Sequence, residues 1–160
     1  ERLVRAQDYE LNTRIIKYGG LVWLNPKILL TYKNQASLYN FYHKQITLEA
    51  PYNSYMWWID IDTFNFRHSI TGFFSFGFIA GCILSPFSKL IFYPFIFIMA
   101  LYLFLSLYAS FQQAIRFKKF AHIFSLPACF FLFHFLHGLG VLKGCMLLLA
   151  NKAPVQNIQS

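Results

Sequence analysis

The sequence predicts a chain in two parts: an α+β region over residues 1–50, and an α-helical transmembrane region with about three membrane segments. Of the 160 residues, 57% are hydrophobic, 21% aromatic and only 12% charged, whereas a typical soluble domain has about 25% charged residues. The acidic residues end at Asp62, and the rest of the chain is apolar with scattered cations. Such a composition cannot cover a soluble surface but suits helices that face lipid.

This uneven distribution divides the chain into four stretches. We expect a polar region at 1–50, an interfacial linker at 51–69, a transmembrane region at 70–150 and a polar tail at 151–160. The linker contains Tyr55-Met-Trp-Trp58, and Trp and Tyr concentrate at bilayer interfaces. The linker is therefore expected to lay the polar region on the membrane.

Residues Gln7 to Gly20 predict one short helix. Asp8 suits its N-cap or first turn, where a carboxylate meets free N–H groups and the positive end of the helix dipole. Gly19-Gly20 ends the helix. The apolar side chains recur at helical spacing and predict one buried face, at Leu11, Ile15 and Tyr18. A carboxylate fixed at a helix mouth suits acid–base chemistry, although such a residue is more often structural.

Two short strands and a second helix are predicted next. Leu21–Leu24 and Ile28–Tyr32 are β-prone and flank an Asn-Pro turn. Ser37 suits the N-cap of a helix over Leu38–Glu49, which Pro51 should stop. Because two strands and a short helix cannot bury a core of their own, this region should need further structure for stability.

The order of these elements resembles the C-terminal part of the catalytic domain in family two inverting glycosyltransferases of the GT-A fold. The most similar branch is the membrane-bound succinoglycan-type enzymes, which extend lipid-linked sugars in exopolysaccharide synthesis. Their helix usually opens Glu-Asp-Tyr-Glu-Leu-Asn-x-Arg; here Asp8-Tyr-Glu-Leu-Asn12 and Arg14 match, and Gln7 replaces the leading Glu. Near the C-terminus, His137-Gly-Leu-Gly-Val-Leu-Lys-Gly144 is similar to a late Tyr/His-Gly-x-Gly-x-x-x-Gly stretch of that branch.

The resemblance implies that residues 1–50 are an α+β remnant of a GT-A catalytic domain. Asp8 would be the general base that deprotonates the acceptor hydroxyl. The candidates for the acceptor or diphosphate site are Glu10, Arg14, Lys44 and Gln45, and the alternative for Gln45 is a solvated helix residue. Gln35 stands where the family has an Arg, so one charge for the diphosphate is missing.

The resemblance also implies partners: a nucleotide-sugar donor, a lipid-linked oligosaccharide acceptor, and a divalent metal (Mg or Mn) in the complete enzyme. No metal ligands are identified in this chain, because Asp60-Ile-Asp62 follows the Asp8 helix whereas the family's metal-binding Asp-x-Asp precedes it. A solvent-side acidic pair is expected instead.

The chain shows no Gly-rich loop and no initiating Met, which suggests a fragment or a truncated reading frame. The competing class is a non-enzymatic membrane anchor, scaffold or transporter subunit.

Three apolar segments are expected in the membrane. They are Ile70–Ser85, Leu90–Phe111 and Phe120–Leu142, the last broken by Pro127 and a Gly-Leu-Gly stretch. Gly77-x-x-x-Gly81 in the first segment has the spacing of a helix-packing motif.

The cations predict the orientation of a multi-pass protein in the cell membrane. The first 69 residues and the Arg116–Lys119 loop are rich in Lys and Arg, so both should be cytoplasmic. Three full spans would put the C-terminus outside, whereas a re-entrant third segment would keep it inside; the pattern leaves both open. The net charge of +8 does not indicate nucleic acid, because the cations flank apolar segments.

The third segment carries His134 and His137 at a spacing that puts both on one helix face. Ionisable groups at membrane depth usually mark function or pair internally. A metal site would need a carboxylate or thiol partner, and Cys129 and Cys145 are distant in sequence. Contact with polar headgroups or an acceptor diphosphate is the favoured interpretation.

Overall fold

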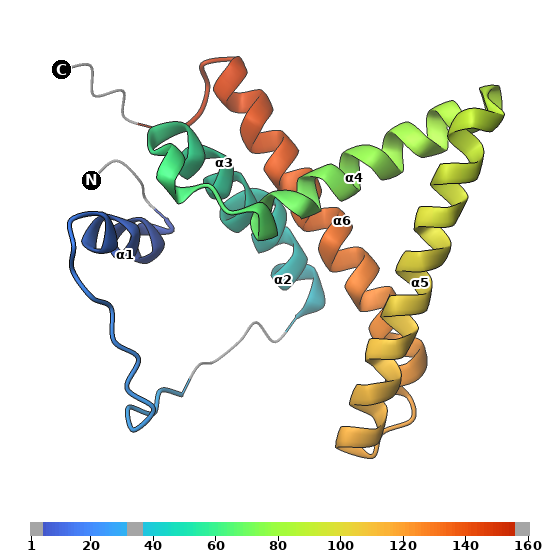
Figure 1. Cartoon of the computed structure of the whole chain (residues 1–160), viewed down its shortest axis with the longest axis horizontal. Helices are drawn as coiled ribbons and strands as arrows, with labels where there is room; N and C mark the ends of the chain where they lie inside the picture. Colours follow the sequence, from blue (N-terminus) through green and yellow to red (C-terminus); the bar gives the residue numbers. More distant parts are fainter. Residues whose placement is uncertain (1–4, 32–36, 156–160) are drawn as a thin grey trace.

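A computed structural model describes residues 5–31 and 37–155, and these residues form helices with no β-strand among them (Figure 1). In chain order the elements are α1 (Gln7–Lys17), α2 (Leu38–Lys44), the π-helical turn η1 (Gln45–Glu49), α3 (Ala50–Ile59), the 3-10 turn η2 (Ile61–Thr63), α4 (Phe66–Leu84), the 3-10 turn η3 (Ser85–Phe87), α5 (Lys89–Phe117) and α6 (His122–Leu149).

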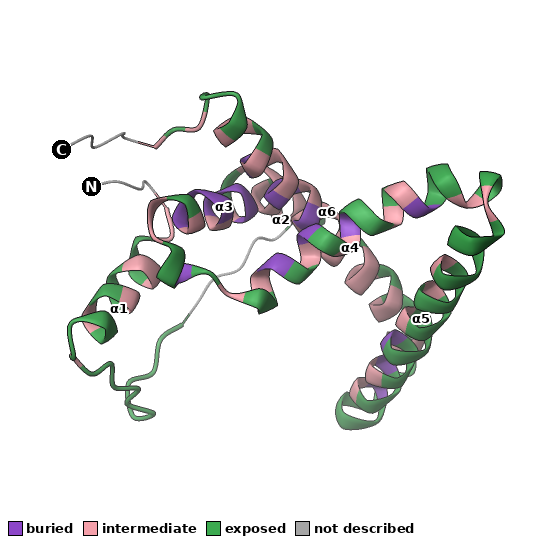
Figure 2. Ribbon diagram, turned by 45° about the horizontal axis from the view of Figure 1, so that its top comes forward, coloured by how far each residue is buried: buried purple, intermediate pink, exposed green. Residues whose placement is uncertain are grey.

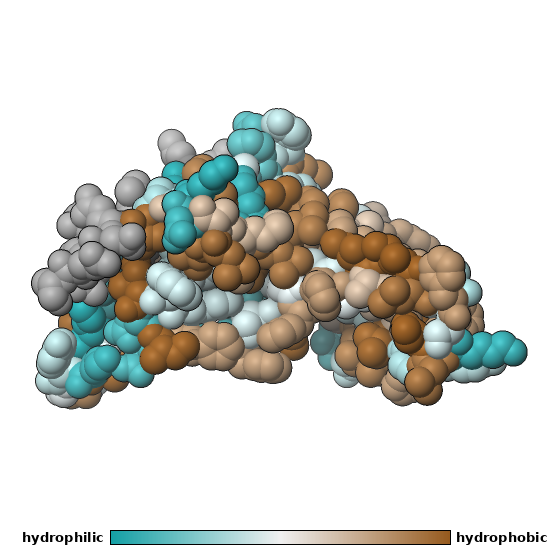
Figure 3. Space-filling model, turned by 90° about the horizontal axis from the view of Figure 1, so that it is seen from above, coloured by the Kyte–Doolittle hydropathy of each residue, from teal (hydrophilic) through white to brown (hydrophobic). Residues whose placement is uncertain are grey.

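The predicted transmembrane region is confirmed at the level of its helices. Three segments are long and apolar enough to cross a bilayer: Phe66–Phe87, Lys89–Phe117 and His122–Leu149. Their connections are tight, as expected, with η3 between α4 and α5 and a short basic turn between α5 and α6. In Figure 3, hydrophobic residues dominate the right-hand part of the surface, where α4 and α5 meet, and hydrophilic residues gather toward the left.

Helix α6 is the centre of the structure, because α3, α4 and α5 all pack against it. Its start lies beside the end of α5, where the rings of Phe117 and His122 meet edge-on with centroids 6.2 Å apart. Its middle is crossed by α4, and its last turns follow η1 and α3. Figure 1 shows the result as a triangle: α4 departs from the middle of α6, and α5 returns to the start of α6.

The largest buried side chains belong to α3, which precedes the three long apolar helices. Tyr52, Tyr55 and Met56 form a buried cluster, and Figure 2 shows α3 as the most continuously buried helix. The stretch expected to be an interfacial linker, 51–69, therefore begins with a packed helix. Its position at a bilayer interface stays a prediction.

The two predicted strands are wrong for the residues that the structure describes. Residues 21–25 and 28–31 have no regular structure, and their apolar side chains are exposed, with Leu24 at 91% and Leu29 at 90%. Tyr32, the expected end of the second strand, lies outside the described residues. A strand needs a paired neighbour to satisfy its backbone, and no described segment pairs with this one. The described part of residues 1–50 is thus helix and irregular chain, without the β part of an α+β unit.

The expected helix stop at Pro51 is also wrong, because α2, η1 and α3 follow one another without a break. Pro51 lies in the first turn of α3, where its missing N–H is least costly. The π-helical turn before it already departs from the α-helical bonding pattern. Ser37 does occupy the N-cap of α2, although its side chain makes no capping bond.

The third membrane helix is likewise continuous, although Pro127 and two glycines were expected to break it. Gly138 and Gly140 instead mark close approaches. A Cβ atom on Gly138 would collide with the carbonyl oxygen of Thr71 in α4, and one on Gly140 would lie 2.6 Å from the Cβ atom of Ala50. These glycines let other backbones touch α6.

Only one glycine of the predicted Gly77-x-x-x-Gly81 motif, Gly81, packs against another helix. Gly77 is exposed with no atom within 4 Å of a Cβ placed there, whereas Gly81 lies against the ring of Phe95. Spacing alone could not show which glycines face another helix.

We predict that Gly138→Ala destabilises the contact between α4 and α6. The added methyl group has no room beside Thr71 and Ser75, and overpacking of this kind costs about 1–3 kcal/mol. Thermal unfolding of the detergent-purified protein should show a lower midpoint. Gly77→Ala is the matched control, and an equal loss in both variants would contradict the packing described here.

Candidate functional site

Helix α1 holds the predicted base, Asp8, in its first turn but not at its cap. The N-cap is Ala6, in a left-handed conformation with φ 60°, and no side chain caps the helix. Asp8 is exposed and forms no hydrogen bond or ion pair with any described residue. Its neighbours Glu10 and Arg14 bind each other, with 2.8 Å between Oε1 and Nε. The carboxylate of Asp8 is therefore free, while the other two predicted groups on α1 neutralise each other.

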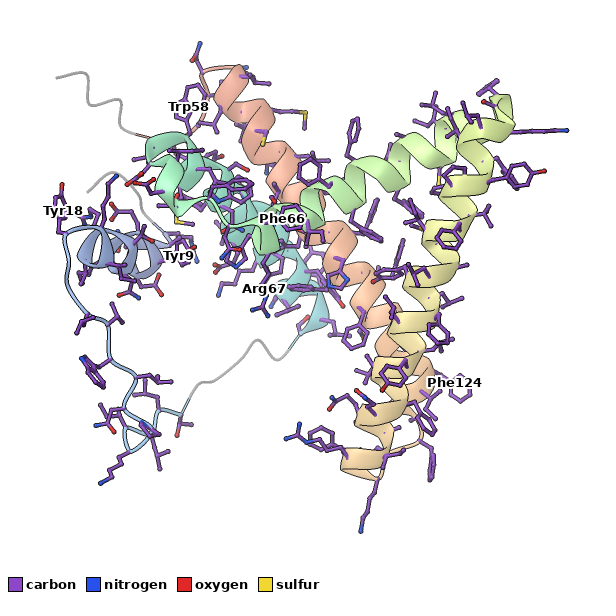
Figure 4. All side chains as sticks on the ribbon, viewed as in Figure 1. Tyr9, Tyr18, Trp58, Phe66, Arg67 and Phe124 are labelled. Carbon is purple, nitrogen blue, oxygen red and sulfur yellow. The ribbon has the colours of Figure 1, made fainter. Side chains whose placement is uncertain are left out.

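The expected apolar face of α1 is wrong, because Leu11 is 47% and Tyr18 85% exposed. Tyr9 makes the contact instead: its ring meets that of His68 edge-on with centroids 5.9 Å apart, and it packs against the α3 cluster. In Figure 4, Tyr9 lies on the side of α1 nearest Phe66 and Arg67, and Tyr18 lies at the far end.

The C-terminal end of α1 is held by the acidic pair after α3. Lys17 Nζ lies 2.5 Å from Asp62 Oδ2 and 3.6 Å from Asp60 Oδ1. Asp60 also accepts the backbone N–H of Asp62 at 3.0 Å, which fixes the η2 turn. The hydrogen bond from Lys17 to Asp62 is the main reason that the pKa of Lys17 is raised above 10.5. The acidic pair that was expected to face solvent thus anchors α1.

A second anchor joins the chain just before α1 to the π-helical turn. Glu49 Oε1 accepts from Lys44 Nζ at 3.1 Å and lies 3.4 Å from Arg5 Nη1. Lys44, a predicted site residue, is therefore already engaged by a carboxylate of its own helix. No hydrogen bond or ion pair between described residues joins Asp8, Glu10 or Arg14 to Lys44 or Gln45.

Gln45 is half-buried and belongs to a chain of three polar side chains. His137 Nδ1 lies 3.0 Å from Gln45 Oε1, and Asn53 Nδ2 lies 3.3 Å from His137 Nε2. Because an amide oxygen can only accept, Nδ1 of His137 must carry the proton, and Nε2 then accepts from Asn53. No described residue accepts a hydrogen bond from the Gln45 amide nitrogen.

His134 and His137, expected on one face, have different neighbours. His134 Nδ1 lies 2.9 Å from the Tyr102 hydroxyl of α5, whereas His137 faces η1 and α3. No three His, Cys, Asp or Glu side chains of the described residues converge as a metal site would require. Both histidines of the third segment therefore form hydrogen bonds with other side chains of the protein.

Further hydrogen bonds continue the Gln45–His137–Asn53 chain along α6, and together these contacts form what we call the polar seam. Ser54 Oγ donates to the Val141 carbonyl oxygen at 2.9 Å, and Cys145 Sγ lies 3.5 Å from Ser54 Oγ. Tyr42 Oη donates to the Cys129 carbonyl oxygen at 3.4 Å, and burial raises the pKa of the Tyr42 hydroxyl. The seam aligns α2, η1 and α3 with one side of α6.

Sequence reasoning missed Glu49 and Asn53, although a signal for them was present. Gln45, Glu49 and Asn53 follow at intervals of four residues, the spacing of one helix face. The assumption that Pro51 ended the helix hid this pattern. Gln35, which stands at the family's Arg position, lies outside the described residues.

Comparison of the chain with protein-family models, with curated protein sequences and with solved structures gave no match.

We predict that Lys17→Met loosens α1. Removing the ammonium group leaves Asp60 and Asp62 without their partner, so the α1 amides should exchange hydrogen faster by mass spectrometry. In the unmodified protein the attraction should be complete below pH 10.5 and be lost as pH rises through the raised pKa of Lys17. Lys27→Met, at an exposed position in the next segment, should leave α1 exchange unchanged.

We predict that Gln45 and His137 are energetically coupled. A double-mutant cycle with Gln45→Ala and His137→Ala, read by unfolding in detergent, should give a coupling of about 1 kcal/mol, the net worth of a typical hydrogen bond. His43→Ala is the histidine control, because His43 stacks on Tyr39 near the surface. Strict additivity of Gln45→Ala and His137→Ala would show that the two side chains are independent.

Proposed function

We propose that the chain is part of a membrane-bound inverting glycosyltransferase, which transfers a sugar from a nucleotide-sugar donor to a lipid-linked or polysaccharide acceptor. One observation carries the proposal. Two of the stretches that carry the family resemblance, the helix with Gln45 and the late His137–Gly144 stretch, lie against each other in the structure.

The contact between these stretches involves both side chains and backbone. His137 Nδ1 donates to Gln45 Oε1 at 3.0 Å. A Cβ atom placed on Gly140 would lie 3.1 Å from the carbonyl oxygen of Gln45. A Cβ atom placed on Gly144 would lie 2.7 Å from the carbonyl oxygen of Pro51, so the two backbones are in close contact. A chain that served only as an anchor has no evident need for this matched pair of motifs, which supports the enzymatic interpretation.

Asp8 suits the base of this reaction because its carboxylate is exposed and has no described partner. In an inverting transfer, the acceptor hydroxyl gives its proton to the base, its oxygen attacks the anomeric carbon, and the nucleoside diphosphate leaves from the opposite face. Gln45 would donate through its amide nitrogen, which has no described acceptor, to an oxygen of the acceptor or the diphosphate.

The donor and its divalent metal would not be held by the described part of this chain. Asp60 and Asp62 are engaged by Lys17, and no third ligand converges on them. In the proposed enzyme the Mg or Mn ion and the nucleotide are therefore bound by other elements.

We propose that the catalytic part is cytoplasmic in a multi-pass protein of the cell membrane. The basis is the cluster of cations at the α5–α6 turn, Arg116, Lys118 and Lys119, together with the positive-inside rule.

The test is sugar transfer by the protein at its natural length in its own membranes. Radiolabelled UDP-glucose, UDP-galactose and GDP-mannose are supplied in turn, and the label is followed into the lipid extract. We expect Asp8→Asn to abolish transfer, because an amide cannot accept the hydroxyl proton. Ile16→Ala, an exposed substitution on the same helix outside the matched motif, should leave transfer intact. Transfer at the unmodified rate by Asp8→Asn would remove the assignment and favour the non-enzymatic class.

A further inference from the structure

Both ends of the described chain pack on the same buried cluster. Tyr52, Tyr55 and Met56 of α3 contact Ala6 and Tyr9 at the start of α1, and they also contact residues 153 and 155 beyond the end of α6. The hydrocarbon core of a bilayer is about 30 Å thick, so it cannot separate groups that touch. The chain before α1 and the chain after α6 must therefore lie on one side of the membrane.

This constraint conflicts with three complete crossings. Three spans after α3 would carry the end of α6 to the face opposite α1, away from the α3 cluster. Two complete crossings return the chain to its starting face. One of the three long apolar helices must then remain on that face.

Helix α6 is the one whose packing fits this position. Its second half runs beside α2, η1 and α3 in the same direction: the rings of Phe41 and Phe133 stack with centroids 6.1 Å apart, and Ser54 binds the Val141 carbonyl oxygen. The accompanying helix carries the ion pair of Lys44 and Glu49. Charged groups are costly in hydrocarbon but acceptable at the headgroup level, so the helix pair belongs at the membrane surface.

Helices α4 and α5 fit a membrane hairpin. They are joined by the tight η3 turn, and their rings meet at two levels, Phe78 with Phe95 at 6.2 Å and Phe74 with Tyr102 at 4.8 Å. Helix α4 crosses α6 instead of running along it (Figure 1), so the two helices cannot both stand upright in a bilayer.

The charges at the two turns give the direction of the hairpin. The α4–α5 turn carries Lys89 alone, whereas the α5–α6 turn carries Arg116, Lys118 and Lys119. By the positive-inside rule the α5–α6 turn stays in the cytoplasm and the α4–α5 turn crosses.

We propose that α4 and α5 cross the bilayer as a hairpin while α6 lies inclined along the cytoplasmic surface, in contact with the lipid headgroup layer and covered by α2, η1 and α3. Both ends of the described chain are then cytoplasmic. Exposed apolar side chains along α6 face the lipid, among them Phe124 at 82% and Leu149 at 82%, and Phe124 projects from the start of the helix in Figure 4. The proposal does not depend on the proposed enzymatic function.

Site-directed labelling with a membrane-impermeant maleimide tests this arrangement. In the full chain, the native cysteines Cys82, Cys129 and Cys145 are replaced by alanine. One cysteine is then added at an exposed position of each segment, as Asn12→Cys, Lys89→Cys, Lys119→Cys or Lys152→Cys. Sealed inside-out vesicles should be labelled at positions 12, 119 and 152 without detergent, and at position 89 only after detergent is added.

Two results would overturn the proposal. Protection of position 152 together with position 89 would mean that α6 crosses completely. Labelling at 89 with protection at 119 would mean that α5 and α6 form the crossing hairpin. A reporter enzyme fused after Ser160 in the otherwise unmodified protein gives an independent measurement, in case the cysteine replacements disturb folding, and it must report the same side as position 12.

Discussion

Close contact between backbones on the glycine-bearing face of α6 is the constraint on which the rest of the structure depends. Gly138 admits the backbone of α4, Gly140 admits Ala50, and Gly144 admits Pro51. Between lipid-exposed helices the hydrophobic effect contributes little, so association depends on close packing and on hydrogen bonds. A side chain larger than hydrogen at these positions would separate α6 from both α4 and the helix formed by α2, η1 and α3.

Hydrogen bonds then fix how the helices align on that face. Gln45, His137 and Asn53 form one chain of donors and acceptors, and Ser75 Oγ donates to the Phe135 carbonyl oxygen at 2.7 Å on the side of α4. Away from water such bonds are strong and an unpaired group is costly, so a shift of one helix along another would leave several groups unsatisfied. Packing brings the helices together, and the polar seam selects one alignment.

The same alignment places the residues of the proposed reaction. Helix α1 is attached at its start by Tyr9 and at its end by Lys17, and the exposed Asp8 carboxylate lies directly before the first of these anchors. Gln45 is held by a histidine 92 residues away. The bond that orients Gln45 comes from His137 of α6, which Asn53 of α3 holds in turn. The candidate site and the helix packing therefore share their supporting contacts.

The amino-acid sequence alone determined the features that depend only on residues close together in the chain. Neighbouring residues determine the long apolar helices, the tight turn after Leu84, the basic turn after α5 and the end of α1, with Gly19 at φ 80°. The motif also predicts Asp8 and Gln45 as site residues, and their roles stay predictions. The tertiary structure decided what depends on distant partners. Residues 21–31 have strand-forming side chains but no described strand to pair with, Pro51 continues a helix because the π-turn precedes it, and Glu49, Asn53 and His137 acquire their roles only through contacts between α6 and the N-terminal helices. A hydrogen bond or a strand needs a second group at the right distance, and that distance is set by the packing of α6.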